Sequence, residues 1–388
     1  MSELKVNSIK GVGASSSAIT VNNTDGTCTV KATNNLSNRR ITTNGDMRIA
    51  QRGTSSTSSG YATIDRFPVF HANTDEAPTQ AQVAVASGTT PYTLGFRKAL
   101  KITNGNQTSG AGSNDYIWIQ NKIEAQDIAN SGWNYLSSSS YITLSFWVKS
   151  SVAQTFKGYI ETIDGTAYQY PFETGSLTAD TWTKITKKIP GNSNLTFDDN
   201  NEEGFKISII PMMGTDKTAN SVTEDAWSTY SSSARIKDVT TTWYTTNDAT
   251  FELTGVQLEV SEYASEFEHK SYSDELLRCM RYCQVFGGDV NYSSFGVGVW
   301  KTSTSASCVL SLMTQMRAAP TLTVANPTDS FIRSGGTNIT TTTVALDISS
   351  PKSAMYNANA SSGGTNGHGA THLGSANTNT TLTLSSEL

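Results

Sequence analysis

The chain has 388 residues, of which 16% are charged, and a formal net charge of −5. Without a dense cluster of Lys and Arg, this mild acidity argues against binding to nucleic-acid backbones. No apolar run approaches the roughly 20 residues of a membrane-spanning helix, and we expect neither membrane insertion nor a secretory signal. Hydrophobic residues still make up 36% of a chain rich in Ser, Thr, Asn and Gly, which favours β-structure over disorder.

Residues 1–40 predict a thin N-terminal segment. Residues 4–9, 17–23 and 27–33 are three short β-like pieces with only one or two apolar residues each. Such strips bury little in a monomer, because isolated short strands are marginally stable in water. They suit either packing against identical strips of other copies or docking on a partner. The alternative is a flexible tail.

The polar side chains of residues 44–55, NGDMRIAQRGTS, could line an active site or lie on the polar face of a strand. Met47 and Ile49 share one parity, whereas Asp46 and Arg48 share the other. This period of two favours a half-buried strand. We therefore expect Asp46 and Arg48 on an exposed or inter-subunit face.

Residues 41–272 predict one β domain of sandwich type. Alternation is clearest where Ile142, Leu144, Phe146 and Val148 share one parity. Seven or more strands joined by Ser-, Asn- and Gly-rich loops favour an antiparallel sandwich over a parallel α/β sheet. The strongest strand predictions are residues 94–104, 115–123, 141–151, 156–163, 181–189, 204–212 and 249–260.

Residues 271–286 predict one helix, which links this domain to a smaller antiparallel β domain within 273–388. Ser271 or Ser273 can cap the helix N-terminus. Leu276, Met280 and Cys283 form a stripe that packs against a domain. The following strand predictions are residues 296–300, 306–316, 321–327, 331–334, 341–348 and 381–386.

The four cysteines are predicted to be free, partly buried thiols. Cys279 and Cys283 are four residues apart, but neither Cys28 nor Cys308 has the close partner that a four-cysteine zinc site needs. Free thiols suit folding in a reducing cytoplasm, and a metal site or a disulfide is the alternative. We predict no cofactor.

The order of several stretches carries a resemblance to a known family. NGDMRIAQRGTS, IQNKIEAQDI, TLSFWVKSS and TWTKITKKIPG, followed by FELTGVQLEVSEYASEFEHKSYSDELLRCMRYCQ, resemble a module common in bacteriophage tail-fibre proteins. MRAAPTLTV is similar to the piece that usually follows this module, and ELKVNSIKG to the start of tail fibres from marine and cyanobacterial phages. The resemblance implies a jelly roll like that of carbohydrate-binding modules, a virion location and a homotrimer. It weakens after Pro320.

Catalytic patterns are weak in this sequence. Asp198, Asp199, Glu202 and Glu203 lie in one acidic run, whereas glycan hydrolysis needs two carboxylates held across a cleft. We interpret the run as a solvated turn, with a cation site as the alternative. There is also no nucleophile-elbow motif, and we predict no enzymatic activity.

The histidines are predicted to be structural or exposed. His368 and His372 lie in a Gly-rich stretch that argues against a helix, so we interpret them as exposed loop residues. The alternative is a metal ion held by three copies of this loop on a threefold axis. His71 and His269 flank predicted strand ends and are interpreted as structural.

Sugar binding is the function that the aromatic residues favour most. Trp227, Tyr230, Trp243 and Tyr244 lie in polar, loop-like stretches, where amphipathic aromatics favour a contact surface for a sugar or a neighbouring subunit. Trp118, Trp147 and Trp182 lie in predicted strands and are interpreted as core. Trp300 is open to both interpretations.

These observations predict an all-β virion protein: a tail fibre that attaches to other tail proteins through residues 1–40 and contacts host-surface glycans. It would be made in the host cytoplasm. Repeated weak contacts of a trimer would add through effective concentration. The alternatives are a structural connector or decoration protein of the virion, a monomeric carbohydrate-binding module, and a glycan depolymerase.

Overall fold

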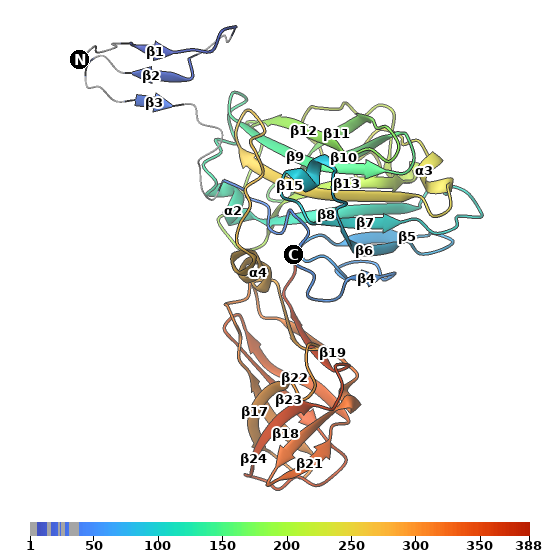
Figure 1. The fold of residues 1–388 in the computed structure, drawn as a ribbon, viewed down its shortest axis with the longest axis vertical. Helices are drawn as coiled ribbons and strands as arrows, with labels where there is room; N and C mark the ends of the chain where they lie inside the picture. The colour runs from blue at the N-terminus through green and yellow to red at the C-terminus, as the bar shows by residue number, and fades with distance from the viewer. Residues whose placement is uncertain (1–5, 14–16, 22–23, 25–27, 31–38) are drawn as a thin grey trace.

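The computed structural model describes residues 6–13, 17–21, 24, 28–30 and 39–388. A small N-terminal sheet lies apart from a large β-sandwich, and a smaller β domain projects from the opposite side of that sandwich (Figure 1). The N-terminal sheet is an antiparallel meander of β1 (Ser8–Ile9), β2 (Ile19–Val21) and β3 (Cys28–Val30). The predicted short strands are therefore present, although residues 4–5, 22–23, 27 and 31–33 of those stretches lie outside the described part.

The large domain is a jelly-roll β-sandwich of two six-stranded antiparallel sheets. The first sheet contains, in spatial order, β14 (Ser228–Thr229), β11 (Tyr168–Ser176), β10 (Thr155–Thr162), β13 (Glu203–Met213), β8 (Tyr116–Glu124) and β5 (Val69–Ala72). The second contains β12 (Thr183–Pro190), β9 (Tyr141–Ser150), β15 (Thr250–Val260), β7 (Lys98–Thr103), β6 (Thr79–Ala84) and β4 (Ser55–Ser56). Short helices α1 (Thr90–Thr93), α2 (Ala125–Ala129), η1 (Thr215–Lys217) and α3 (Thr242–Thr245) lie in the loops.

The core of this sandwich follows the predicted alternation. Ile142, Leu144, Phe146 and Val148 all lie in it, fully buried. Their neighbours of the other parity, such as Trp147, therefore belong to the outer face of the second sheet. Each of the seven strand predictions overlaps a strand of the structure over most of that strand's length, so this part of the fold is confirmed.

The prediction of a strand at residues 44–55 is wrong for most of its length. Only Ser55 begins a strand; the residues before it form turns and irregular backbone, with positive φ at Asn44 and Met47. Asp46 is buried and pairs with the partly buried Arg48 at 2.8 Å. Polar side chains serve the backbone of this buried loop, since the Asn44 side chain donates to the carbonyl oxygens of Ile49 and Asp65.

The linking helix α4 (Tyr272–Met280) is shorter than predicted. Ser271 is its N-cap and accepts a hydrogen bond from the Asp274 backbone, as predicted. However, the helix ends at Met280, and Cys283 begins a strand instead of completing an apolar stripe. The buried helix residues are Glu275 and Cys279. Glu275 pairs with the buried Arg40, so this face of the helix contacts a charged group as well as apolar ones.

The C-terminal domain is a second, smaller antiparallel sandwich. One sheet has three strands: β16 (Cys283–Gly287), β25 (Thr381–Ser385) and β19 (Thr321–Ala325). The other has seven: β21 (Thr337–Thr340), β20 (Ser330–Ser334), β24 (Gly369–Gly374), β17 (Ser294–Trp300), β18 (Ser305–Leu310), β23 (Ser353–Asn359) and β22 (Thr343–Ser350). A 3-10 turn, η2 (Pro327–Asp329), precedes β20. Trp300 lies in the core between these sheets, which answers the open question about it.

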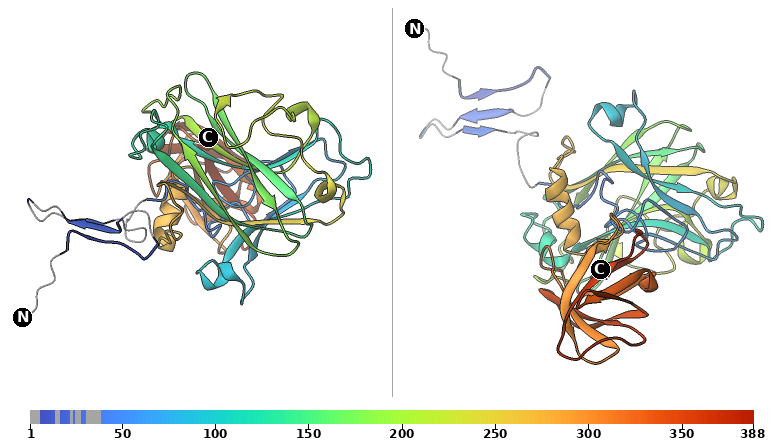
Figure 2. Two further views of the ribbon diagram at one scale, coloured as in Figure 1. Left: turned by 90° about the horizontal axis from the view of Figure 1, so that it is seen from above. Right: turned by 60° about the horizontal axis from the view of Figure 1, so that its bottom comes forward.

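The end of the chain returns to the junction between the two sandwiches (Figure 2). Glu387 pairs with Arg66 and, at 3.1 Å, with Arg52. The Arg281 guanidinium and the Tyr282 hydroxyl both donate to the Glu124 carboxylate, and these bonds hold the pKa of Glu124 below its usual value although burial opposes this. Pairs of charged groups therefore hold the junction together. Because these groups are largely removed from water, each would be costly to bury without its partner.

The cysteines of the described helix and strands are free, as predicted for them. Cys279, Cys283 and Cys308 are buried, and burial raises the pKa of each thiol, to about 11 for Cys308. Buried, protonated thiols are poor nucleophiles. Within the described residues, no helix has the length and apolar character needed to cross a bilayer.

Candidate functional site

A pocket of about 230 Å³ opens on the outer face of the second sheet of the large sandwich. It lies against β9, β12 and β15, and the segment after β15 folds back along its edge. Four separate regions of the sequence therefore meet there, near residues 94–96, 145–147, 184 and 255–269. The lining residues are Leu94, Phe96, Ser145, Trp147, Lys184, Gly255, Ser265, Glu266, Phe267 and His269.

The floor of the pocket depends on a glycine in a strand irregularity. Gly255 has a φ of +65°, and the register of β15 against β9 shifts between Thr254 and Gln257. A Cβ at this position would lie 2.7 Å from the Phe96 ring and 3.1 Å from Trp147. The space next to these rings therefore exists because residue 255 has no side chain.

The walls are aromatic and fixed by contacts with one another. The rings of Phe96 and Phe267 meet edge to face at 4.9 Å, and His269 packs against both. The His269 Nε2 atom is also 2.9 Å from the Leu94 carbonyl oxygen, which confirms a structural role for this histidine. A pre-formed aromatic wall loses little entropy when a ligand binds.

Polar groups surround this aromatic wall. Lys184 lies directly opposite Trp147 in the β9–β12 pairing, and Ser145 is two residues from that tryptophan on the same face. Glu266 provides the one carboxylate among the lining residues. The pocket thus combines an indole, a cation, a hydroxyl and an anion around a small space.

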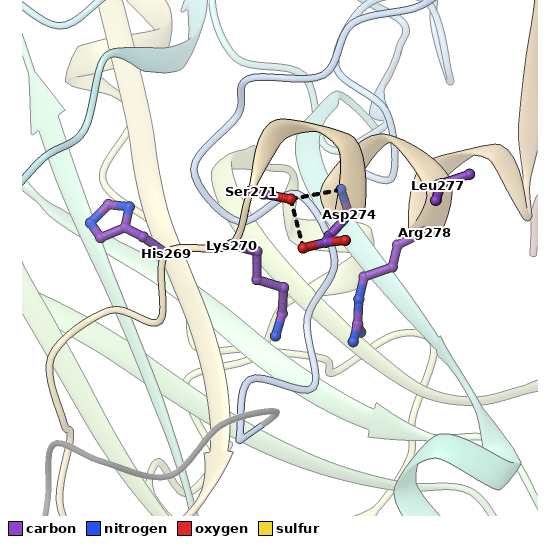
Figure 3. A pocket seen from close by; sticks show the side chains of 6 residues that line it. All are labelled: His269, Lys270, Ser271, Asp274, Leu277 and Arg278. Atoms are coloured by element: carbon purple, nitrogen blue, oxygen red, sulfur yellow. Dashed lines mark hydrogen bonds between the residues drawn. The ribbon is translucent and has the colours of Figure 1, made fainter.

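A second, more polar hollow of about 520 Å³ adjoins the first and shares His269 with it. Figure 3 shows Lys270 and Arg278 pointing to the same side of this hollow, next to the capped start of α4. The Ser271 hydroxyl donates to the Asp274 carboxylate at 2.6 Å, and Lys270 lies 3.0 Å from Glu268. Because both positive and negative side chains line the hollow, it does not favour a ligand of one charge over the other.

Trp243 and Tyr244 do not form a contact surface, which corrects the prediction. Both lie on the short helix α3 and are buried in the sandwich core. The Trp243 indole donates to the Thr250 carbonyl at 3.0 Å, and the Tyr244 hydroxyl donates to Asp115 at 2.9 Å. The flanking Thr, Asn and Asp residues are typical of a loop and led to the prediction. The two aromatic side chains nevertheless pack in the core.

Trp227 and Tyr230 are partly buried, and the structure does not bring them to one site. Trp227 packs on Tyr170 and donates to the Pro190 carbonyl at 2.7 Å. Tyr230 accepts a hydrogen bond from Arg235, whose guanidinium also lies over Trp118. Their role in ligand binding stays a prediction.

The interpretation of the strand tryptophans as core is wrong for Trp118, Trp147 and Trp182, which are all only partly buried. Trp147 lines the pocket, because it has the outward parity of β9. Trp182 precedes β12 and packs partly exposed beside the pocket, where Lys149 lies 5.3 Å from its ring. Trp118 is half-buried on the outer face of the first sheet. Parity, and not membership in a strand, separates these residues from the core.

The acidic run has the exposure of a solvated turn, as interpreted, at Asp198, Asp199 and Glu202. Asp199 accepts from Asn130, and Glu202 lies 3.3 Å from Arg317. Glu203 instead belongs to β13 and pairs with Lys122 at 2.9 Å. In the described part of the chain, no three His, Cys, Asp or Glu side chains gather as metal ligands would.

His372 corrects the interpretation of exposed loop histidines. It lies in β24, fully buried, with its ring nitrogens 3.1 Å from the Tyr356 hydroxyl and 2.9 Å from the Ser330 hydroxyl. Burial lowers its pKa to about 4, so it is neutral near pH 7. His368 is exposed at the start of the strand, as interpreted.

Comparisons with known proteins give likenesses of fold but no family. No family model matches the chain, and no curated protein matches it. Among solved structures, 57% of the chain aligns with 22% of the enzymatically active domain of tailspike protein 4 of bacteriophage CBA120, at 8% identity and a TM-score of 0.30. A putative sugar-binding protein of Bacteroides thetaiotaomicron is similar over 57% of this chain and 100% of its own, at 13% identity and a TM-score of 0.29.

The N-terminal cellulose-binding domain of β-1,4-glucanase C from Cellulomonas fimi is similar over 56% of this chain and 100% of its own, at 10% identity and a TM-score of 0.27. The matched share of the tailspike domain is less than a quarter of its length. At these identities and TM-scores the likenesses carry no argument about function, which has to come from the pocket itself.

Proposed function

We propose that this chain is a glycan-binding protein without enzymatic activity, and that it works as a receptor-binding tail fibre of a bacteriophage virion. The observation that carries glycan binding is the pocket beside Trp147. A sugar ring has an apolar face that packs on an indole and hydroxyls that bond to polar groups, which is the pairing this pocket offers.

The size and charge of the pocket favour binding of a single sugar unit over cleavage. Its volume of about 230 Å³ is below the roughly 300–1,000 Å³ of pockets for drug-sized ligands. Glu266 is its one lining carboxylate, whereas glycoside hydrolysis generally uses a pair held about 5–10 Å apart. One ring held by one tryptophan gives weak affinity, which suits a protein that presents several copies.

The fibre role is supported by the order of sequence stretches shared with tail-fibre modules and by the separation of the N-terminal sheet from the sandwich (Figure 1). In this proposal, residues 1–40 attach the chain to another tail protein, and three chains assemble into a homotrimer. The sandwich then faces the host envelope. The protein would be made in the host cytoplasm and reside in the virion.

The test is a titration of the full-length protein with purified host-surface polysaccharide, followed by calorimetry. We expect Trp147→Ala to weaken binding at least tenfold, because the indole provides the apolar platform. Trp118→Ala is the matched control, since it removes a half-buried tryptophan from the outer face of the other sheet and leaves the pocket intact.

Loss of binding in the Trp118 variant alone would contradict the assignment to the pocket. Failure of the wild-type protein to bind any host polysaccharide would contradict the proposed function and favour a structural connector. New reducing ends after incubation with the polysaccharide would contradict the absence of enzymatic activity.

A further inference from the structure

The outer face of the seven-stranded sheet in the C-terminal domain carries a row of uncharged, mostly apolar side chains. Val297 pairs directly with Thr371 on one side and with Val309 on the other. Val309 pairs with Met355, and Met355 with Ile348. Directly paired side chains lie about 4.5–5.5 Å apart, so the row is continuous across five adjacent strands. We call these five residues the neutral row.

The neutral row is open to solvent in the single chain. Val297 and Ile348 are each 64% exposed, and Val309 is 44% exposed. The solvent-exposed face of an antiparallel sheet normally carries polar residues at such positions. A contiguous exposed apolar strip marks a surface that meets another molecule.

Charge is confined to the margins of this face. The next row across the sheet, Val299, Ser307, Asn357 and Ala345, is also uncharged. At one margin Lys301 lies 3.2 Å from Asp347, and at the other Arg333 pairs with Asn338 on the edge strand. An apolar centre with a polar rim is the anatomy of a protein–protein interface.

We propose that this face packs against a second copy of the same chain. An uncharged strip can pack on a copy of the same chain without like charges meeting, and it can do so around the axis of the proposed homotrimer. The rim also offers both signs of charge side by side at Lys301 and Asp347, so that each copy presents an acid and a base to its neighbour. A charged partner would find no matching charge at the centre.

The dimensions suit such an interface. Seven strands about 4.8 Å apart span about 29 Å, and strands of this length run about 20 Å. The projected area is about 600 Å² per copy, close to the roughly 800 Å² per partner of a standard interface and above most crystal contacts. Flat faces of Val, Ile and Met can interdigitate as the two sheets of a sandwich do.

The experiment measures the molar mass of the full-length protein by light scattering over a range of concentrations. We expect the wild type to exceed the 41.6 kDa of one chain. The double variant Val297→Glu, Ile348→Glu would weaken association at least hundredfold, because it places two carboxylates of every copy in one apolar interface. Leu136→Glu and Val260→Glu, exposed apolar sites on the large sandwich, are the matched controls and would leave the mass unchanged.

A charge-swapped pair separates association from misfolding. The variant Val297→Lys, Ile348→Lys would also associate weakly alone, and its mixture with the Glu variant would recover the larger mass. A wild-type mass of 41.6 kDa, or an unchanged mass in both double variants, would overturn the proposal. Because the face lies outside the large sandwich, sugar titration of each variant reports on the pocket independently.

Discussion

The two sandwiches bury their polar groups in different ways. At the edge facing the C-terminal domain, the large sandwich buries ionised pairs: Arg40 with Glu275, both fully inaccessible, and Arg66 with Glu387. The C-terminal domain instead buries the neutral ring of His372 between two hydroxyls. Both solutions give the buried group a polar partner, but only the first depends on two opposite charges staying together.

The contrast follows from what each region must hold. The charged groups come from segments that lie far apart in the sequence, and the pairing of opposite charges fixes how these segments and α4 meet. The neutral group bonds strands of one sheet: His372 on β24 contacts the neighbouring β20 and also β23, which lies beyond β17 and β18, and the backbone pairing of the sheet already sets their positions. The loss of a buried charge's partner should therefore have the larger effect.

Glu275→Ala tests the charged side of this contrast and should have the largest effect. It leaves the Arg40 guanidinium buried without its partner and removes the acceptor of the Asn44 backbone N–H. We expect the free energy of unfolding in urea to fall by about 3–5 kcal/mol. Glu262→Ala, which breaks an exposed pair with Lys188, is the control and should cause no measurable change. Equal effects of the two variants would contradict the role of burial.

The pH dependence at His372 tests the neutral side. Because burial lowers its pKa to about 4, the unfolded chain binds a proton between about pH 6.5 and 4 that the folded domain does not. Stability is therefore full above about pH 6.5 and falls by about 3 kcal/mol as the pH drops to about 4.

Amide hydrogen exchange in β20, β23 and β24 at pH 7 and pH 4.5 measures this domain separately. The variant His372→Gln should lose most of the difference between the two pH values, whereas exposed His368→Gln should retain it. A pH response that is identical in all three proteins would assign it to other groups.

Ser271→Ala should have the smallest effect of these variants on the free energy of unfolding. The Ser271 hydroxyl accepts one hydrogen bond from the Asp274 backbone at the exposed start of α4. We expect a loss of about 1 kcal/mol in urea unfolding, with Ser273→Ala, outside the cap position, as the control. A loss as large as that of Glu275→Ala would mean that the cap and the buried pair act as one unit.

Much of the strand content could be predicted because one face of each strand is buried. The parity of Ile142 to Val148 places those residues in the core, and the same parity already places Trp147 outside it. The prediction failed where a short local pattern imitated this signal. Asp46 and Arg48 alternate in a buried loop, and the residues around Trp243 are polar although the indole is core.

The pocket could not be predicted from local sequence. Trp147, Gly255 and Phe267 come from different strands and a returning segment, and only the sandwich topology brings them together. Gly255 did carry a signal, since a glycine between Thr254 and Val256 inside a strand pattern is typical of a bulge or a close approach. His372 was hidden for a related reason, because the Gly-rich stretch before it resembles a loop while its own residues pair on both sides.

The C-terminal domain is fastened to the large sandwich at two neighbouring places. Its first strand, β16, follows α4. Its last strand, β25, pairs with β16, and just after it Arg66 of the large sandwich pairs with Glu387 and Lys122 donates to the Leu388 carbonyl at 2.8 Å. A body held at one point can swivel freely, whereas two anchors restrict it to bending about the line between them. A push along that line on the far end of this domain would thus be carried as torque into the large sandwich, whereas a push across the line would bend the junction.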